Sequence, residues 1–310
     1  MNLDLNKVKT YSIKKRFSKI DKDAFSKVCG KKSGFGQFYA SLPGILKAKD
    51  FKAVVEAIVC AKRKNKPVIL MMGAHVIKCG LGPLVIDLLK KKVISLVALN
   101  GAGIIHDFEI AYQGATSEDV GEALKDGSFG MSKETAEFIN QAVTSGVKKG
   151  LGLGESVGRA IAAEALKYKE YSILYNCHKE GVPSCVHAAI GTDIIHQHPS
   201  FSGASTGEGS QRDFLKLSAA IAKIGGGGVV LNVGSNVILP EVFLKALNLA
   251  RNLGHKADNF VTANFDMVYH YRPAVNVVAR PTQDSGKGYY IIGHHEIMLP
   301  LLHRAIIEKI

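Results

Sequence analysis

The chain alternates between amphipathic segments and short segments that are apolar without a break. Residues 50–64 place apolar side chains at helical spacing with charges on the opposite face, which predicts an amphipathic helix. Residues 67–72 are continuously apolar and end at Gly73, as is typical of a strand with both faces covered. Residues 84–91 and 93–99 repeat this helix and strand pattern.

The same pattern continues to the end of the chain. It predicts a helical insertion over 116–169, strands over 184–190, 229–233, 259–265 and 289–292, and helices from residue 210, over 240–253 and up to residue 307. Residues 203–210 are predicted as a flexible loop able to cover a site, and Ser210 with Asp213 as a capping box. Strands that alternate with helices predict an α/β fold, a parallel sheet with helices on both faces, in a single domain over 36–310.

Composition supports a folded protein and excludes several other classes. With 310 residues, 46% of them apolar, the chain can bury a large core, which excludes a disordered or fibrous protein. Its apolar stretches are far shorter than the roughly 20 residues of a membrane span. The N-terminal residues lack the apolar core of a secretory signal peptide. Five cysteines without a Cys-x-x-Cys pair favour reduced thiols, so we expect a cytoplasmic protein without a membrane partner.

The formal net charge of +13 raises the question of a nucleic-acid partner. The lysines are scattered over predicted helix surfaces and lack interleaved aromatic residues, which favours a solvated surface over a nucleic-acid site. A nucleic-acid binder is kept only as an alternative, on charge alone. Residues 1–35 are the exception, because basic side chains outnumber acidic ones there, and they predict a basic arm that packs on a neighbouring subunit or on a ligand.

Six segments that follow predicted strands turn polar and glycine-rich together. They are residues 73–75, 100–107, 191–198, 234–236, 264–270 and 293–296. Ligands of open parallel sheets bind outside the carboxyl ends of the strands, where these segments meet. The sequence therefore predicts one ligand site at this edge of the sheet.

The segment Asn100-Gly-Ala-Gly103 offers small residues followed by a helix start, whose free N–H groups favour a phosphate or carboxylate. A plain tight turn is an equally good interpretation, because the third glycine of a dinucleotide motif is missing. Asp107 and Glu109, further along, are candidates to receive ribose hydroxyls or an amine.

Histidines gather in the same segments. Asp193, His196 and His198 lie within six residues, a spacing that suits either the ligands of a divalent metal such as zinc or a base with an orienting carboxylate. His294 or His295 would join them in the metal hypothesis. A single histidine of this kind is usually structural, whereas the group indicates a site.

Several of these segments, taken in order, resemble the deoxyhypusine synthase family. The similar stretches are Gly226-Gly-Gly-Val-Val230 with Asn236, Thr262-Ala-Asn-Phe-Asp266 with Arg272-Pro273, Leu299-Pro-Leu-Leu302, and upstream Asn100-Gly-Ala-Gly103 with Asp107 and Gly191-Thr-Asp193. The resemblance implies a Rossmann-like fold, a homotetramer with sites at subunit interfaces, and NAD as cofactor. It also implies a cofactor pocket lined by Asn100, Gly101, Ala102, Gly103, Asp193, Gly226, Gly227, Gly228, Asn236, Thr262 and Asp266.

Two departures separate this chain from the family's own reaction. Asn232 stands where the family carries its catalytic histidine, and Pro281 where it carries the imine-forming lysine. Asparagine exchanges no proton near neutral pH and proline has no amine for an imine. Deoxyhypusine synthesis itself is therefore not expected.

The function expected from the sequence is that of a deoxyhypusine-synthase-like enzyme, a homo-oligomer that binds NAD or a related nucleotide and acts on a small amine or polar metabolite. Its acid and base residues would be His106, Asp107, His196 and His198. One alternative is a metal-dependent hydrolase or lyase that uses Asp193, His196 and His198. Another is a nucleotide- or metabolite-binding protein without catalysis.

Overall fold

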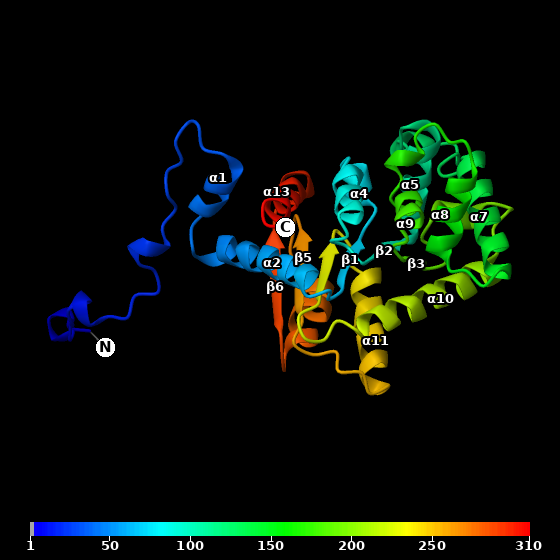
Figure 1. The fold of residues 1–310 in the computed structure, drawn as a ribbon. Coiled ribbons are helices and arrows are strands. Elements are labelled where there is room, and N and C mark those ends of the chain that lie inside the picture. The colour runs from blue at the N-terminus through cyan, green and yellow to red at the C-terminus, as the bar shows by residue number, and fades with distance from the viewer. Residues whose placement is uncertain (1–2) are drawn as a thin grey trace. The chain divides into compact units, whose positions relative to one another are not determined.

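The structure is a computed structural model that describes residues 3–310, and within them a six-stranded parallel sheet organises the chain (Figure 1). The strands are β1 (Val68–Met72), β2 (Leu96–Asn100), β3 (Ser184–His187), β4 (Val229–Val233), β5 (Val261–Asp266) and β6 (Lys287–Ile292). Their order across the sheet is β3-β2-β1-β4-β5-β6, and every neighbouring pair is parallel. The predicted α/β fold with a parallel sheet is confirmed.

The order of the strands reverses direction at β1. Met72 pairs with Leu99 of β2 on one side and with Val233 of β4 on the other. The chain therefore leaves β1 and β4 toward opposite halves of the sheet, which creates a switch point between their carboxyl ends. This is the place where open parallel sheets bind ligands.

Helices connect the strands or flank them. They are α2 (Leu46–Arg63), α3 (His75–Lys78), α4 (Gly82–Lys90), α5 (Gly101–Gln113), α6 (Val120–Ala123), α7 (Lys133–Lys148), α8 (Leu153–Ala163), α9 (Ile173–Glu180), α10 (Gly203–Ile221), α11 (Ile238–Asn252), α12 (Tyr271–Pro273) and α13 (His295–Ile307). Of these, α2 lies before β1 and α13 after β6. None of the helices within residues 3–310 is long and apolar enough to cross a membrane.

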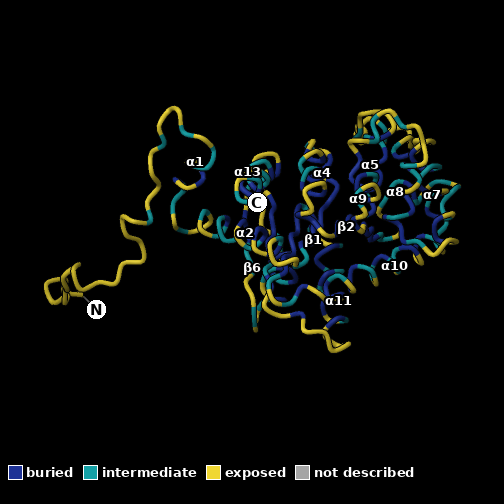
Figure 2. The backbone as a smooth tube through the Cα atoms, in the orientation of Figure 1, coloured by how far each residue is buried: buried dark blue, intermediate teal, exposed yellow. Residues whose placement is uncertain are grey.

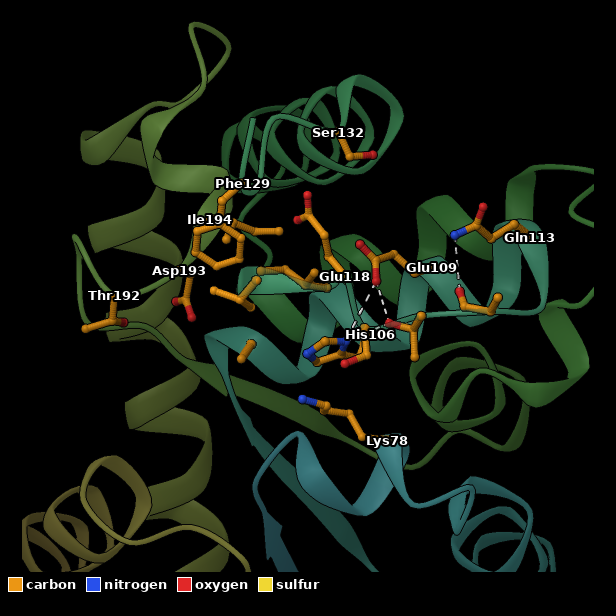
Figure 3. A pocket seen from close by; sticks show the side chains of 16 residues that line it. Lys78, His106, Glu109, Gln113, Glu118, Phe129, Ser132, Thr192, Asp193 and Ile194 are labelled. Atoms are coloured by element: carbon orange, nitrogen blue, oxygen red, sulfur yellow. Dashed lines mark hydrogen bonds and ion pairs between the residues drawn. The ribbon is translucent and has the colours of Figure 1, made fainter. Parts of the chain in front are cut away.

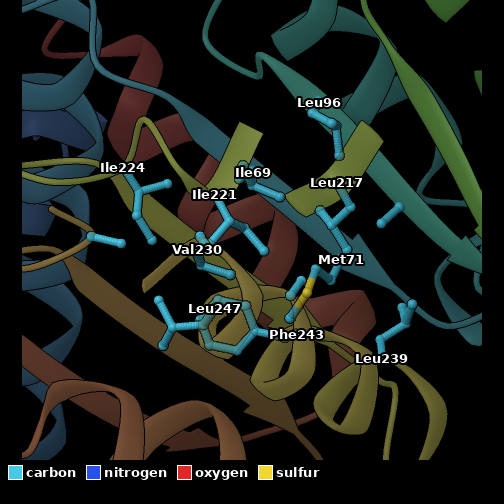
Figure 4. Close-up of a cluster of buried hydrophobic side chains, with 14 of the residues drawn as sticks. Ile69, Met71, Leu96, Leu217, Ile221, Ile224, Val230, Leu239, Phe243 and Leu247 are labelled. Atoms are coloured by element: carbon cyan, nitrogen blue, oxygen red, sulfur yellow. The ribbon is translucent and has the colours of Figure 1, made fainter. Parts of the chain in front are cut away.

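Both faces of the sheet are covered, because successive side chains of a strand point to opposite faces. Ile69 and Met71 of β1 pack with Leu217 of α10 and Phe243 of α11 in a buried apolar cluster (Figure 4). The alternate residues of β1, Val68 and Leu70, lie with apolar side chains of α2, α4 and α13. Strands β1 to β5 are consequently buried along most of their length, whereas β6 at the end of the sheet is partly exposed (Figure 2).

The segment before β4 differs from its prediction. Residues 203–210 are not a loop, because α10 begins at Gly203, with the Ser202 side chain accepting a hydrogen bond from the N–H of Ser205 (3.2 Å). Ser210 lies inside this helix and is not its cap. Three glycines in eight residues suggested a loop, but the helix buries Thr206, Gly209 and Asp213, and tertiary packing overrides their low helix propensity.

A short helical segment was missed by the sequence pattern. After β5 the chain forms α12, a π-helix over Ala274–Ala279 and a 3-10 turn over Arg280–Thr282. Pro273 and Pro281 bracket the π-helix, and both residues predict turns when read alone. Val277 nevertheless belongs to the buried apolar cluster.

The chain divides into two units, Met1–Asp50 and Phe51–Ile310, and the predicted basic arm lies within the first. Within that unit, 3-10 turns occur at Leu5–Lys7, Ile13–Lys15 and Lys22–Ala24, and α1 spans Phe35–Ser41. The N–H of Lys27 donates to the carbonyl of Ser41 (3.0 Å). Residues 3–33 are exposed almost throughout (Figure 2).

Gly73→Ala tests the close contact of backbones at the switch point. A Cβ atom at residue 73 would lie 2.1 Å from the carbonyl oxygen of Gly234, so the loops after β1 and β4 would have to separate. We expect a loss of about 1–3 kcal/mol in the free energy of unfolding, measured by urea denaturation. Gly207→Ala in α10 is the matched control, because a Cβ there meets nothing within 4 Å, and it should stabilise by about 0.5–1 kcal/mol. Equal effects of the two changes would contradict the close contact.

Candidate active site

A cavity of about 640 Å³ lies beside the amino end of α5, at the carboxyl edge of the sheet (Figure 3). It is lined by α3, α5, the segment 113–132 and residues 192–194. Its ionisable lining residues are Lys78, His106, Glu109, Glu118 and Asp193. The cavity thus combines three carboxyl groups with one lysine and one imidazole.

The start of α5 forms one wall of this cavity. Asn100 is its N-cap, and the Asn100 side chain accepts a hydrogen bond from the N–H of Gly103 (3.1 Å). The helix therefore begins at Gly101, three residues earlier than predicted, so Gly101, Ala102 and Gly103 form its first turn. Gly101 has to be glycine, since a Cβ there would lie 1.9 Å from Oδ2 of Asp193.

One face of α5 contributes four side chains to the cavity. Ala102, His106, Glu109 and Gln113 all line it, at steps of four, three and four residues. This spacing keeps side chains on the same face of a helix.

His106 is held by a hydrogen-bond relay. Nδ1 of His106 lies 2.6 Å from the Thr116 hydroxyl, and that hydroxyl donates to Oε2 of Glu109. Because the hydroxyl has a single proton, His106 must donate from Nδ1, and Nε2 keeps a free lone pair. Burial raises the pKa of Glu109, but the nearby imidazole of His106 and the hydrogen bond from Thr116 outweigh burial and lower the pKa overall. The arrangement suits a base oriented by a carboxylate.

Asp193 is the most deeply buried carboxylate of the cavity lining. Its side chain is 5% exposed and rests against Gly101 at the first turn of α5. Burial raises the pKa of Asp193 to about 6. Its Oδ2 atom has no hydrogen-bond partner among residues 3–310.

His196 lies behind Asp193 and does not line the cavity. Its Nδ1 accepts hydrogen bonds from the N–H groups of Gly191 (3.0 Å) and Asp193 (3.3 Å), so its proton sits on Nε2, 3.7 Å from Oδ2 of Asp193. Burial lowers the pKa of His196, which is consistent with a neutral ring. His196 therefore lies beside Asp193 without a hydrogen bond to Oδ2 of its carboxylate.

His198 does not join this group. Its Nδ1 lies 2.8 Å from the Ser200 hydroxyl and accepts a hydrogen bond from the N–H of Ser200 (3.2 Å). The ring thus braces the turn before α10. The predicted pairing of both imidazoles at one centre is not what the structure forms, because residues 194–197 make a 3-10 turn that aims alternate side chains in different directions.

Asp107 is also directed away from the cavity. Its carboxylate accepts hydrogen bonds from the Ser172 hydroxyl (2.5 Å) and the N–H groups of Ile173 (2.7 Å) and Leu174 (3.1 Å), and so caps α9. Adjacent residues of an α-helix point about 100° apart, which explains why His106 faces the cavity and Asp107 does not. Burial raises the pKa of Asp107 to about 6, and its hydrogen bonds oppose the rise.

The residues predicted to bind the cofactor lie in three places. Ala102 and Asp193 line the cavity, and Asn100, Gly101 and Gly103 flank Ala102 at the start of α5. Asn236 and Asp266 follow β4 and end β5 at the same edge of the sheet. Gly226, Gly227 and Gly228 precede β4 and lie at the opposite, amino edge, where the N–H of Gly227 donates to the carbonyl of Asn259 (2.8 Å). Thr262 is the second residue of β5 and is fully buried. The glycine run therefore shapes a turn away from the site, a correction that only the strand direction reveals.

A second group of polar side chains lies at the carboxyl ends of β4, β5 and β6. Nδ2 of Asn232 donates to Oδ1 of Asn264 (2.6 Å) and to the carbonyl of Ser235 (2.8 Å). Several buried atoms there have no partner among residues 3–310: Asn232 Oδ1, Asn236 Oδ1, Asn264 Nδ2, Asp266 Oδ2 and His295 Nδ1. Buried polar atoms are normally satisfied by protein, water or ligand, so this group is a second place for a polar ligand to contact.

Metal ligation finds no support in the side-chain arrangement. Within residues 3–310, no group of three or more histidine, cysteine, aspartate or glutamate side chains is placed to hold a metal ion. His294 and His295 follow β6, whereas Asp193 follows β3 at the other end of the sheet.

Three residues of this edge were missed at the sequence level. Lys78, Thr116 and Glu118 line the cavity. Asn264, which begins the predicted segment 264–270, joins the polar group of β4 and β5. Lys78 follows His75 by one helical turn, a signal that could have been used. Thr116 and Glu118 lie in an irregular segment, where periodicity carries no information about direction.

Asp193→Asn tests the energetic cost of burying the charged carboxylate. The pKa of Asp193 in the wild-type protein rises from 3.8 to about 6 on folding. The free energy of unfolding therefore decreases as pH rises through this window and the carboxyl group loses its proton. The variant has no carboxyl group at this position and lacks this pH-dependent loss of stability. Its free energy of unfolding relative to wild type should therefore increase by up to about 3 kcal/mol between pH 4 and pH 8. Urea unfolding at both pH values measures it. A stability difference that is the same at pH 4 and pH 8 would contradict the burial of an unpaired carboxylate.

Comparison with known proteins supports the fold alone. No protein-family model matches the chain, and no curated protein matches it significantly in sequence. Among solved structures, ArgZ, a cyanobacterial arginine dihydrolase, is 15% identical with a TM-score of 0.52, over 85% of this chain and 33% of ArgZ. This chain thus spans about a third of that enzyme.

Two further structures match over most of their own length. A candidate LOR/SDH protein from Methanococcus maripaludis S2 is 16% identical with a TM-score of 0.50, over 91% of this chain and 72% of that protein. A candidate deoxyhypusine synthase from Entamoeba histolytica is 12% identical with a TM-score of 0.52, over 90% of this chain and 94% of that protein. The resemblance seen in the sequence is thus confirmed at the level of the fold, which is deoxyhypusine-synthase-like.

Proposed function

We propose that this protein is an enzyme that binds NAD or a related nucleotide at the carboxyl edge of its sheet and acts on a small amine. The observation that carries the proposal is the cavity beside α5, in which a base held by a relay stands among three carboxyl groups. An excess of carboxylates favours a cationic substrate over an anionic one.

The residues present fit a dinucleotide in part. Asn100 to Gly103 supply a capped helix start of small residues, which suits a phosphate group. Asn236 and Asp266, which follow or end the strands β4 and β5, have buried oxygen atoms without partners. Since β2 and β5 are three strand positions apart, about 14 Å, a ligand that contacts both has to be elongated. Gly226 to Gly228 do not fit, because they lie at the amino edge.

His106 is the residue best placed for proton transfer. Its free Nε2 faces the cavity and its Nδ1 is fixed by Thr116 and Glu109. A nicotinamide would supply a hydride acceptor, and the chain itself would supply the base that takes a proton from the amine substrate. Thr116 and Glu109 then act as positioning residues for this base.

The name of one structural neighbour supports a nitrogen-rich substrate. ArgZ is named as an arginine dihydrolase, although this chain spans only a third of it. Support from the neighbours is therefore limited to the fold and to this class of substrate.

Ala102→Glu tests the position of the nucleotide. Ala102 lies in the first turn of α5 and lines the cavity, so a glutamate there would repel a phosphate. Because repulsion between charges about 4 Å apart at a protein surface is on the order of 1–4 kcal/mol, NAD⁺ affinity should fall at least about fivefold in isothermal titration calorimetry. Ala102→Gln, of equal size and without charge, is the control and should bind as wild type does. Wild-type protein that takes up no NAD⁺ would refute the nucleotide itself.

His106→Ala tests the base. We expect turnover, followed as formation of reduced nicotinamide with an amine substrate, to fall about 10²- to 10⁴-fold, while NAD⁺ affinity stays within about threefold. Thr116→Val should lower turnover less, because the imidazole remains but loses its orientation. Full activity in His106→Ala would show that the proton goes elsewhere.

A further inference from the structure

Asp193 presents an oxygen atom that this chain leaves unpaired. The carboxylate is 95% buried, since 5% of the side chain is exposed, and it lines the cavity. Oδ2 has no hydrogen-bond partner among residues 3–310, and His196 Nε2, at 3.7 Å, lies outside hydrogen-bond range. A buried carboxylate oxygen without a partner is unfavourable unless a ligand donates to it. The resemblance to the deoxyhypusine synthase family implied that Asp193 contacts the cofactor. Asp193 lines the same cavity as His106, however, which favours a contact with the substrate.

Lys78 presents the opposite charge in the same cavity. Its side chain comes from the end of α3 and points toward the imidazole of His106 (Figure 3). Its ammonium has no hydrogen bond or ion pair to any residue in the range 3–310 that the structure describes. Lys78 is also the single lysine among the lining residues, against three carboxyl groups. A free ammonium beside the base is suited to an anionic group of the ligand.

We propose that the cavity binds a basic amino acid, that is, a molecule with one carboxylate and a second, cationic nitrogen at the end of its side chain. This inference rests on the proposed function, since it names the substrate class of the same site. The carboxylate pairs with Lys78, the α-amino group lies next to Nε2 of His106, and the side-chain nitrogen donates to Oδ2 of Asp193. Glu118, whose Oε2 already accepts the N–H of Gly130 (2.9 Å), adds negative charge to the lining.

Binding of three related probes separates the two charged contacts. L-lysine has both groups, L-norleucine lacks the side-chain ammonium, and 1,5-diaminopentane lacks the carboxylate. Measured by isothermal titration calorimetry on the full chain with and without NAD⁺, L-lysine should bind about 10- to 100-fold more tightly than either relative, since each loses one hydrogen bond between charged groups.

Two substitutions assign each contact to its residue. In Asp193→Asn, the preference for L-lysine over L-norleucine should fall to about threefold or less, while the preference over 1,5-diaminopentane remains. In Lys78→Met, the pattern should be reversed. Lys149→Gln, an exposed lysine after α7, is the matched control and should leave both preferences unchanged. Because each variant loses one preference and keeps the other, unfolding cannot imitate the result.

The outcomes distinguish this inference from the proposed function. Equal affinity for the three probes, or no binding of L-lysine, would overturn the amino-acid assignment, and NAD⁺ binding would then still support the proposed function. If Asp193→Asn weakens NAD⁺ binding and leaves the L-lysine preference intact, the carboxylate serves a ribose and the inference is wrong. Selective binding of L-lysine to a protein that does not bind NAD⁺ would leave the inference standing and remove the nucleotide.

Discussion

Burial of both faces of the sheet is the constraint on which the rest of the structure depends. Strands such as β1, with every residue buried, leave no room for polar side chains except at the two edges where the chain turns. All the strands are parallel, so all six begin at one edge of the sheet, the amino edge, and end at the other, the carboxyl edge. The polar and ionisable residues of the candidate site gather at the carboxyl edge. The glycine run 225–228 lies at the amino edge, before β4.

Strands β4 and β5 relax this constraint in a specific way. Asn232 and Asn264 are fully buried in the interior of these strands and are bonded to each other, and Asp266 ends β5 with an unpaired oxygen. Residues of this kind lower stability unless they are satisfied, so their concentration beside the switch point is unlike that of a structural core. The polarity therefore extends from the cavity at β2 across to β5, along the line that an elongated ligand would follow.

The fold was largely predictable because its signals are repeated. Apolar runs, glycine turns and amphipathic segments recur at each strand and helix, so one misread segment, such as residues 203–210, leaves the topology unchanged. The site was less predictable because it depends on direction. The sequence places His106 beside Asp107 and His196 near His198, but neither pair faces one centre, since helical geometry separates near neighbours in the sequence. The relay from His106 reaches Thr116 instead, ten residues away in an irregular segment that shows no periodicity.

The segment 100–113 shows how one helix supports several roles. Its first turn is free of side chains where Asp193 approaches, its cavity face carries His106 and Glu109, and its other face uses Asp107 to cap α9. Asp107 and Asp193 are both buried with their pKa raised to about 6, but Asp107 has three donors and Asp193 leaves Oδ2 unpaired. Selection for stability alone would favour either hydrogen-bond donors to both oxygen atoms of Asp193, as Asp107 has three donors, or a different residue at this position. Asp107 lies within α5 and Asp193 packs against the first turn of that helix. The contrast between these two buried carboxylates is the basis for assigning Asp107 to the structure and Asp193 to the proposed ligand.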